Sequence, residues 1–168
     1  MRVFLIGFMG AGKTWMGKQI GLLTGLPTYD LDASIEQQEG AVVSTLFKQK
    51  GEDYFRLLEQ KYLHAITTAN SQLVLSCGGG TPCFFDNLDF MKKNGIVVWL
   101  NPSVAVLANR LQLAGQDRPL LEGIPSHKLE EYIQLKLKER FFFYEQAHFQ
   151  LSESTPDPAA LIKLIQHG

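Results

Sequence analysis

Gly7-Phe8-Met9-Gly10-Ala11-Gly12-Lys13-Thr14 matches the pattern G-x-x-x-x-G-K-[ST] at every fixed position. A buried strand is predicted before it, at Val3–Ile6, because this run is short, apolar and stopped by a glycine. A helix is predicted after it, from Lys13 to about Thr24, ending at Gly25. Strand, glycine-rich loop and helix in this order predict a loop that binds phosphates.

Each residue type in this loop has a chemical reason. Glycines let backbone N–H groups turn toward an anion, so we expect Met9, Gly10, Ala11 and Gly12 to surround the phosphates of a nucleotide. Lys13 could reach the β- and γ-phosphates, and the Thr14 hydroxyl could ligate Mg²⁺. A glycine-rich turn that binds nothing is the alternative. The motif alone does not distinguish a kinase from a hydrolase or a nucleotide switch.

Beyond the loop, short apolar runs alternate with longer amphipathic stretches, which predicts an α/β domain with a parallel sheet. Strands are predicted at Leu73–Cys77 and Ile96–Leu100, with weaker signals at Thr28-Tyr29 and Phe149–Leu151. Helices are predicted from Glu52 to about Ala69, from Val104 to Leu113, from Leu129 to about Tyr144, and from Pro158 to Gln166. We therefore expect a three-layer α/β/α sandwich with its active site at the carboxyl ends of the strands.

Length and charge restrict the class of protein. A chain of 168 residues favours one domain, and 16 Lys and Arg against 17 Asp and Glu leave a net charge of −1. No strong basic field is present for a long nucleic acid, and no apolar stretch approaches the roughly 18 residues of a membrane helix. Two cysteines, Cys77 and Cys83, are too few for a disulfide framework. We therefore expect a cytoplasmic protein that binds neither nucleic acid nor a membrane.

Two carboxylates follow the weak strand in Tyr29-Asp30-Leu31-Asp32, and a helix is expected to begin near Ala33. Alternation along a strand would separate the two side chains, so that one faces a metal and the other the acceptor. The alternative is that Asp32 only caps the helix.

Two arginines suggest an anionic substrate. Arg56 falls in the first turns of the helix whose apolar face is Phe55, Leu58, Tyr62 and Ile66. A cation there opposes the helix dipole, which indicates that Arg56 has a partner. Arg140 precedes the aromatic run 141–144. Two arginines suit bidentate binding of a carboxylate, although each alone would be an ordinary surface residue.

Glycines mark two further segments. Gly78, Gly79 and Gly80 follow a predicted strand, which indicates either close backbone approach to a ligand or a plain tight turn. Residues 114–124 resemble a hinged connection, so they could form a lid that swings Arg118 onto the transferring phosphoryl group.

The ordered set of these segments resembles the shikimate kinase family, P-loop kinases of the nucleoside-monophosphate-kinase type, over essentially the whole chain. The segments are Gly7–Thr14, Asp30–Asp32, Gly51–Arg56, Gly78–Gly80, Arg118–Leu121, and Arg140 with Tyr144. The resemblance implies a five-stranded parallel sheet in the order 2-3-1-4-5. It also implies one domain over residues 1–168, with a substrate-binding segment at about 32–60 and a lid at about 112–124.

The resemblance further implies transfer of the γ-phosphate of ATP to the 3-hydroxyl of shikimate by a monomer. Lys13, Asp32 and Arg118 would be catalytic, and Asp32 would orient or deprotonate the attacking hydroxyl. By the same resemblance, Thr14 ligates Mg²⁺ and Asp30 holds it through water, Arg56 and Arg140 clamp the carboxylate, Gly78, Gly79 and Gly80 approach the ring, and Arg110 lies against adenine. Alternatives are another small-molecule kinase, acting on gluconate or a nucleoside monophosphate, and a non-catalytic nucleotide-binding regulator.

Overall fold

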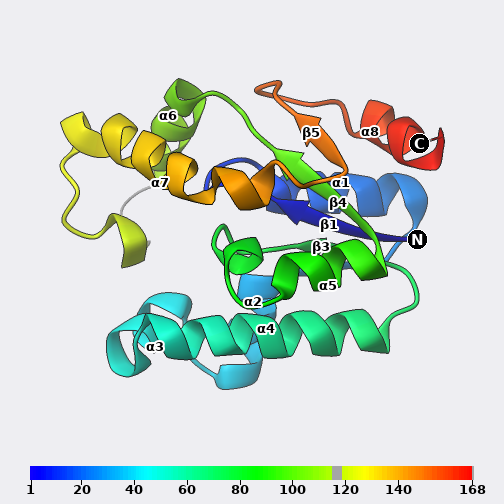
Figure 1. Ribbon diagram of the computed structural model, residues 1–168, viewed down its shortest axis with the longest axis horizontal. Helices are drawn as coiled ribbons and strands as arrows, with labels where there is room; N and C mark the ends of the chain where they lie inside the picture. Colours follow the sequence, from blue (N-terminus) through cyan, green and yellow to red (C-terminus); the bar gives the residue numbers. More distant parts are fainter. Residues whose placement is uncertain (115–118, 168) are drawn as a thin grey trace.

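A computed structural model describes residues 1–114 and 119–167 of the chain. Its centre is a five-stranded sheet in the order β2-β3-β1-β4-β5, in which every neighbouring pair is parallel (Figure 1). The strands are β1 (Arg2–Ile6), β2 (Thr28–Asp30), β3 (Leu73–Ser76), β4 (Ile96–Leu100) and β5 (Phe149–Leu151). The predicted parallel sheet and its strand order are confirmed.

Helices connect the strands. They are α1 (Lys13–Thr24), α2 (Leu31–Glu39), α3 (Val43–Lys50), α4 (Glu52–Ala69), α5 (Asn87–Asn94), α6 (Val104–Ala114), α7 (Leu129–Tyr144) and α8 (Pro158–His167). Short 3₁₀ turns lie at Thr81–Cys83, Pro119–Leu121 and Ser126–Lys128. The bounds predicted for α1, α4 and α7 are confirmed, and those of α6 and α8 differ by one residue.

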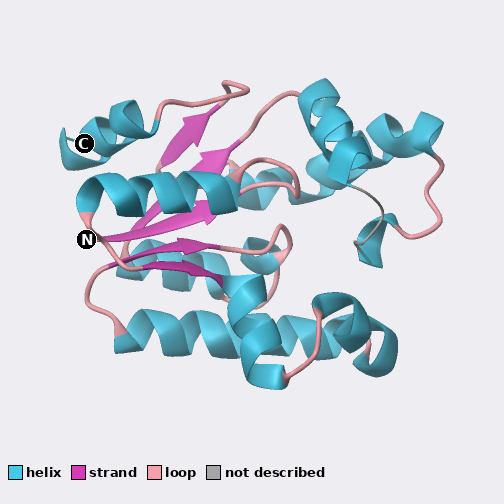
Figure 2. Ribbon diagram, turned by 180° about the vertical axis from the view of Figure 1, so that it is seen from behind, coloured by secondary structure: helices cyan, strands magenta, loops and turns pink. Residues whose placement is uncertain are grey.

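The alternation of side chains along β1 divides the core into two layers. Val3 and Leu5 pack on α1 and α8, together with parts of α6 and α7. Phe4 and Ile6 pack on α2, α4 and α5. Figure 2 shows α1 on the near face of the sheet, and Figure 1 shows α5 on the opposite face. The expected three-layer sandwich is therefore present.

Two helices, α3 and α5, lack a counterpart among the predicted elements. Both are eight residues long, and neither has a side-chain hydrogen bond at its N-cap. Helices this short gain little from propensity, so their stability comes from tertiary packing. Leu46 of α3 and Leu88 and Met91 of α5 are buried in the core layer that contains Phe4. Among the described residues, no helix is long and apolar enough to span a membrane.

Candidate active site

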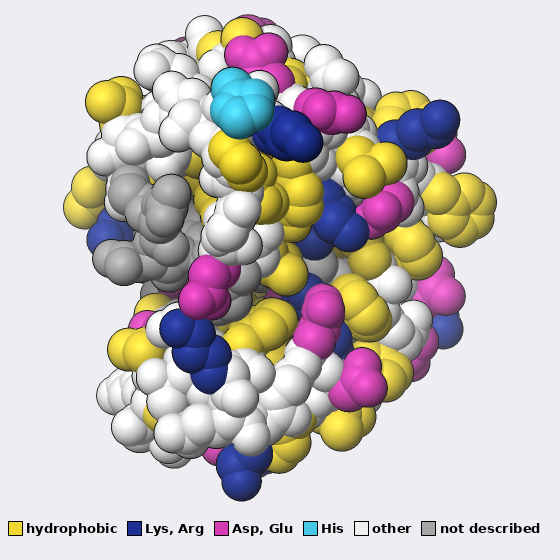
Figure 3. Space-filling view, turned by 90° about the vertical axis from the view of Figure 1, so that its left-hand side faces the viewer, with side chains coloured by type: hydrophobic (Ala, Val, Ile, Leu, Met, Phe, Trp, Pro, Cys, Tyr) yellow, Lys and Arg dark blue, Asp and Glu magenta, His cyan; other side chains and the backbone are white. Residues whose placement is uncertain are grey.

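A cavity of about 660 Å³ opens at the carboxyl edge of the sheet, on the face that Figure 3 shows. It brings together segments that are far apart in the sequence. Most of the predicted site residues line it: Met9, Gly10, Gly12, Lys13, Thr14, Asp30, Asp32, Arg56, Gly78, Gly79, Gly80 and Arg140. Because parallel strands end at this edge, the loops that follow β1, β2 and β3 converge there.

The phosphate-binding loop links β1 to α1. Gly12 is the N-cap of α1 and has a φ of 96°, a left-handed conformation that favours glycine. The Lys13 ammonium donates to the carbonyl oxygens of Gly7, at 2.8 Å, and Phe8, at 2.9 Å. It is therefore held against the loop, next to the N-terminal end of α1, where the helix dipole favours an anion.

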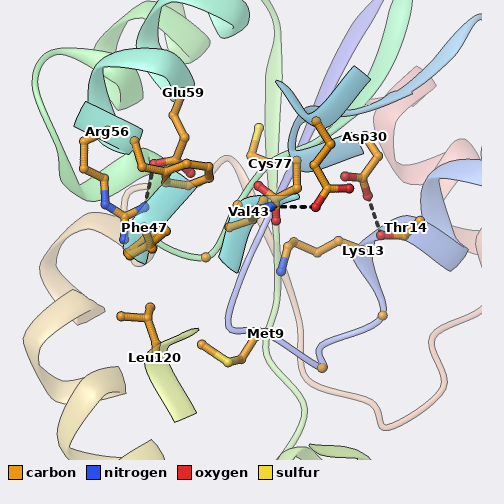
Figure 4. Close-up of a pocket in the computed structure, with 18 of the residues that line it drawn as sticks. Met9, Lys13, Thr14, Asp30, Val43, Phe47, Arg56, Glu59, Cys77 and Leu120 are labelled. Atoms are coloured by element: carbon orange, nitrogen blue, oxygen red, sulfur yellow. Dashed lines mark hydrogen bonds and ion pairs between the residues drawn. The ribbon is translucent and has the colours of Figure 1, made fainter. Parts of the chain in front are cut away.

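Thr14, which follows β1, meets Asp30, the last residue of β2. The Thr14 hydroxyl donates to Asp30 Oδ2 at 2.6 Å (Figure 4). The other carboxylate oxygen of Asp30 accepts from the backbone N–H of Ala33, at 3.2 Å, so Asp30 is the N-cap of α2. The alternative that Asp32 caps this helix is therefore wrong. The helix begins at Leu31, two residues earlier than expected, because the cap is Asp30.

Asp32 lies in the first turn of α2. We had expected strand alternation to separate the two carboxylates. The turn from β2 into the helix separates them instead. A Cβ atom added to Gly78 would lie 3.2 Å from Asp32 Oδ1, which places this carboxylate beside the glycine loop that follows β3. Asp30 thus stays with Thr14, and Asp32 reaches further across the cavity.

Arg56 is buried, and its guanidinium has the partner that its position in α4 predicted. Nη1 donates to Glu59 Oε2 at 2.5 Å, and Nη2 donates to Glu52 Oε1 at 2.8 Å. Burial lowers the pKa of Arg56, but attraction to Glu59 and the hydrogen bonds that the guanidinium donates to both glutamates outweigh it, so the net pKa is raised. The Phe84 ring lies 4.5 Å from the guanidinium carbon and covers it further.

Glu59 is a site residue that the sequence prediction missed. Its side chain is 1% exposed, and its second oxygen accepts from the Thr81 hydroxyl at 2.5 Å. Figure 4 shows Glu59 and Arg56 projecting from one helix into the same end of the cavity. The i,i+3 spacing from Arg56 was the available signal. The apolar face we predicted for this helix obscured it, because the buried side of α4 includes Arg56 and Glu59 beside Phe55 and Leu58.

Replacing Glu59 should therefore destabilise the fold. We expect Glu59→Ala to lower the free energy of unfolding by about 3 kcal/mol or more, because it leaves the Arg56 charge buried without its closest partner. Glu52→Ala is the matched control. Its side chain is 45% exposed, so its loss should cost about 1 kcal/mol or less. Urea unfolding of both variants measures the difference, and equal losses would contradict this account.

The three glycines after β3 make room for charged side chains of the site. A Cβ at Gly80 would lie 2.5 Å from Arg56 Nη1, and one at Gly78 would collide with Glu59 Oε1. A Cβ at Gly79 would lie 3.2 Å from Arg140 Nη1 and 3.4 Å from the backbone nitrogen of Met9. A plain tight turn would not have these close neighbours, so it does not explain the three glycines. The segment instead brings both arginines and the phosphate-binding loop close to one stretch of backbone.

Arg140 approaches the same glycine loop from α7. It is 9% exposed, and its buried Nη1 has no hydrogen-bond partner among the described residues. The neighbouring turn of the helix is held in place by Tyr144, whose hydroxyl donates to Gly79 O at 2.5 Å. Burial raises the pKa of that hydroxyl, so it stays a neutral donor. Arg140 therefore presents an N–H donor close to Gly79 in a buried position.

The remaining predicted residues lie elsewhere. Ala11 and Arg110 line a second, smaller cavity of about 250 Å³ beside the phosphate-binding loop. The Arg110 guanidinium donates to Gly10 O at 3.0 Å and to Ser154 O, so it joins this loop to the segment after β5. Arg118 and residues 115–117 of the predicted lid lie outside the described residues. Burial raises the pKa of the Cys83 thiol to about 11, so this thiol is a poor nucleophile at neutral pH.

One cavity at the carboxyl edge of a 2-3-1-4-5 sheet is lined by Lys13 of the glycine-rich loop, two carboxylates and two buried arginines. This is the arrangement of a P-loop kinase, with positive charge suited to a small anionic acceptor. The family model described as shikimate kinase matches residues 9–167. The chain belongs to the shikimate kinase family.

Individual relatives are shikimate kinases as well. A shikimate kinase of Parabacteroides distasonis is 44% identical over 146 residues, which are 87% of this chain and 84% of that protein. The crystal structure of shikimate kinase from Bacteroides thetaiotaomicron has a TM-score of 0.91 at 37% identity and covers 99% of this chain and 98% of its own. Shikimate kinase from Acinetobacter baumannii, in complex with shikimate, has a TM-score of 0.86 at 33% identity. The match covers 98% of this chain and 90% of that one.

Proposed function

We propose that this protein transfers the γ-phosphoryl group of ATP to the 3-hydroxyl of shikimate, giving shikimate 3-phosphate and ADP. The observation that carries the proposal is the single cavity lined by the phosphate-binding loop at one end and by Arg56 and Arg140 at the other. A nucleotide and a small carboxylate could therefore meet in one cavity. The shikimate complex of the Acinetobacter relative supports the choice of acceptor.

The role of each residue in the site follows from its charge. Lys13 and the N-terminal end of α1 attract the phosphates, while Arg56 and Arg140 bind the carboxylate of shikimate. Asp32 accepts a hydrogen bond from the attacking hydroxyl and orients it in line with the γ-phosphorus. Because phosphoryl transfer depends mainly on positioning and on neutralising the equatorial oxygens, a strong base is not required. Arg118 would add positive charge at the transferring group.

Thr14 and Asp30 fit a magnesium ion. The Thr14 hydroxyl and the Asp30 carboxylate are oxygen ligands 2.6 Å apart at the edge of the phosphate site. No group of three or more His, Cys, Asp or Glu side chains in the described part of the chain is placed to hold a metal. Mg²⁺ takes one or two protein ligands and completes its shell with water and phosphate oxygens, so the oxygens of Thr14 and Asp30 are enough to hold it. Thr14 would ligate the ion directly and Asp30 through water, and the ion would neutralise charge on the transferring phosphates.

The proposal includes the setting of the reaction. We propose a cytoplasmic monomer that needs neither nucleic acid nor a membrane. The net charge of −1 for the whole chain supports the absence of a nucleic-acid or membrane partner, since such a chain carries no strong basic field.

A coupled assay of ADP release tests the activity. With Mg·ATP, we expect release to rise at least a hundredfold when shikimate is added, and to fall to background when EDTA removes the metal. Gluconate and nucleoside monophosphates are the comparison acceptors, and we expect neither to stimulate release. Stimulation by one of them but not by shikimate would show a different small-molecule kinase. ATP binding without product from any acceptor would indicate a regulator.

A further inference from the structure

A chain of buried hydrogen bonds extends from Arg56 and Glu59 into the protein interior. The Thr81 hydroxyl donates to Glu59 Oε1 at 2.5 Å, and the carbonyl oxygen of Thr81 accepts from the side-chain amide of Asn87 at 2.9 Å. Thr81 and Asn87 are both fully buried and do not line the cavity, whereas Arg56 and Glu59 do. Thr81 therefore reaches the acceptor end of the site through Glu59.

The backbone fixes the place from which this hydroxyl acts. Thr81 begins the 3₁₀ turn Thr81–Cys83, and its backbone N–H donates to Gly78 O at 3.1 Å. Asn87, which holds the carbonyl of Thr81, is the first residue of α5. Because the peptide groups on both sides of Thr81 are hydrogen-bonded, the hydroxyl is held next to Glu59.

The donors of the Arg56 guanidinium show what depends on this contact. An arginine carries five N–H groups. In the described part of the chain, Nε and Nη2 each donate to Glu52 Oε1, at 3.1 Å and 2.8 Å, and Nη1 donates to Glu59 Oε2. Five groups less these three leave one N–H on Nη1 and one on Nη2. Such a pair can bind a carboxylate through two parallel hydrogen bonds.

The Thr81 hydroxyl keeps this pair available because it satisfies the second oxygen of Glu59. Without that donor, Glu59 Oε1 would be a buried carboxylate oxygen with no partner, which is costly in the interior. Arg56 already bonds to the same carboxylate, so a small turn of Glu59 would give Oε1 a second N–H of the guanidinium. That N–H would be one of the two left for an acceptor.

We propose that Thr81 is a positioning residue for acceptor recognition. Its hydroxyl holds Glu59 so that Arg56 keeps two N–H donors for the carboxylate of the substrate. The proposal rests on the proposed function, in which shikimate is the acceptor and Arg56 binds its carboxylate. It involves neither the nucleotide nor the attacking hydroxyl.

Variants of Thr81 test this inference through shikimate binding. Thr81→Val exchanges the hydroxyl for a methyl group of similar size. We expect it to raise the dissociation constant and the KM for shikimate about tenfold, while kcat and the KM for ATP change less than twofold. Thr81→Ala, which removes the hydroxyl without adding a methyl group, should behave in the same way. Thr81→Ser keeps the hydroxyl and should stay within about threefold of the native protein. Calorimetry and steady-state kinetics measure these quantities.

Another buried threonine provides the matched control. Thr67, on the same helix as Arg56 and Glu59, is 1% exposed, and its hydroxyl has no hydrogen-bond partner among the described residues. Thr67→Val should therefore leave shikimate binding within twofold of native. A shikimate methyl ester separates positioning from stability. Thr81→Val should lose most of the native preference for shikimate over the ester, whereas a loss of stability alone would leave that preference unchanged.

Two results would overturn the inference by itself. One is native affinity and native ester discrimination in Thr81→Val and Thr81→Ala, even if urea unfolding shows that both are less stable. The other is a loss of affinity in Thr81→Ser as large as that in Thr81→Val. Absence of shikimate binding by the native protein would overturn the inference together with the proposed acceptor.

Discussion

The Asp32→Asn variant is expected to lose turnover by about a hundredfold or more at saturating ATP and shikimate, while its dissociation constant for ATP stays within about twofold. Asp32 lies beside Gly78, away from the Thr14–Asp30 pair at the phosphate end of the cavity. An asparagine of the same size keeps one oxygen acceptor but loses the negative charge that polarises the attacking hydroxyl. Stopped-assay kinetics and calorimetric ATP binding measure the two quantities separately.

The control for Asp32 is another carboxylate of the same cavity. Glu36 also lines it, but its Oε1 accepts from the backbone N–H of Val43 at 2.8 Å, a bond that glutamine can keep. Glu36→Gln should therefore change turnover only a few-fold, although it removes the same charge. Full turnover by Asp32→Asn would remove this residue from the proposed chemistry. A loss of the same size in Glu36→Gln would show that the net charge of the cavity matters rather than the position of Asp32.

The Arg140→Ala variant is expected to weaken shikimate binding about a hundredfold, because it removes the buried donor that we propose binds the carboxylate. Arg140 suits this test better than Arg56. Arg56→Ala should weaken shikimate binding too, but it also leaves Glu59 buried without its cation and lowers stability. Arg140→Lys should recover only part of the affinity, since lysine cannot form the bidentate contact.

A shikimate methyl ester makes the Arg140 test specific. The native enzyme should bind the ester far more weakly than shikimate, whereas Arg140→Ala should discriminate much less, because the contact that senses the carboxylate is gone. Lys138→Ala, an exposed charge on the same helix, controls for general loss of positive potential and should keep the discrimination. Undiminished discrimination in Arg140→Ala would place the carboxylate elsewhere.

Much of the fold follows from local patterns. The bounds of β4, β5, α1, α4 and α7 could be predicted because apolar runs or amphipathic stretches, and in some cases a glycine stop, lie within or next to each segment. The short helices α3 and α5 could not, since packing against the core decides them. The strand order came from the resemblance to a family, because no local pattern specifies which strands pair.

The residues of the site also divide into those that local patterns predict and those that depend on packing. The phosphate-binding loop could be recognised from the sequence because its backbone, its lysine and its hydroxyl are contiguous, from Gly7 to Thr14. Arg56 was found as a cation that opposes a helix dipole, and the same reasoning missed Glu59, whose role appears only with its burial. Asp30 was not considered as the cap of α2, and Asp32 was considered only as an alternative, because the end of a three-residue strand is difficult to place within two residues.

The sequence by itself determined the chemistry available to this protein: an anion-binding loop at a helix N-terminus, carboxylates after a strand and two arginines suited to a carboxylate. Only the tertiary structure decided how they combine. It pairs Thr14 with Asp30, buries Arg56 against Glu59, and brings Arg140 to the glycines after β3. The physical reason is that a parallel sheet collects the carboxyl ends of distant strands at one edge, so contacts there depend on strand order and helix packing rather than on spacing along the chain.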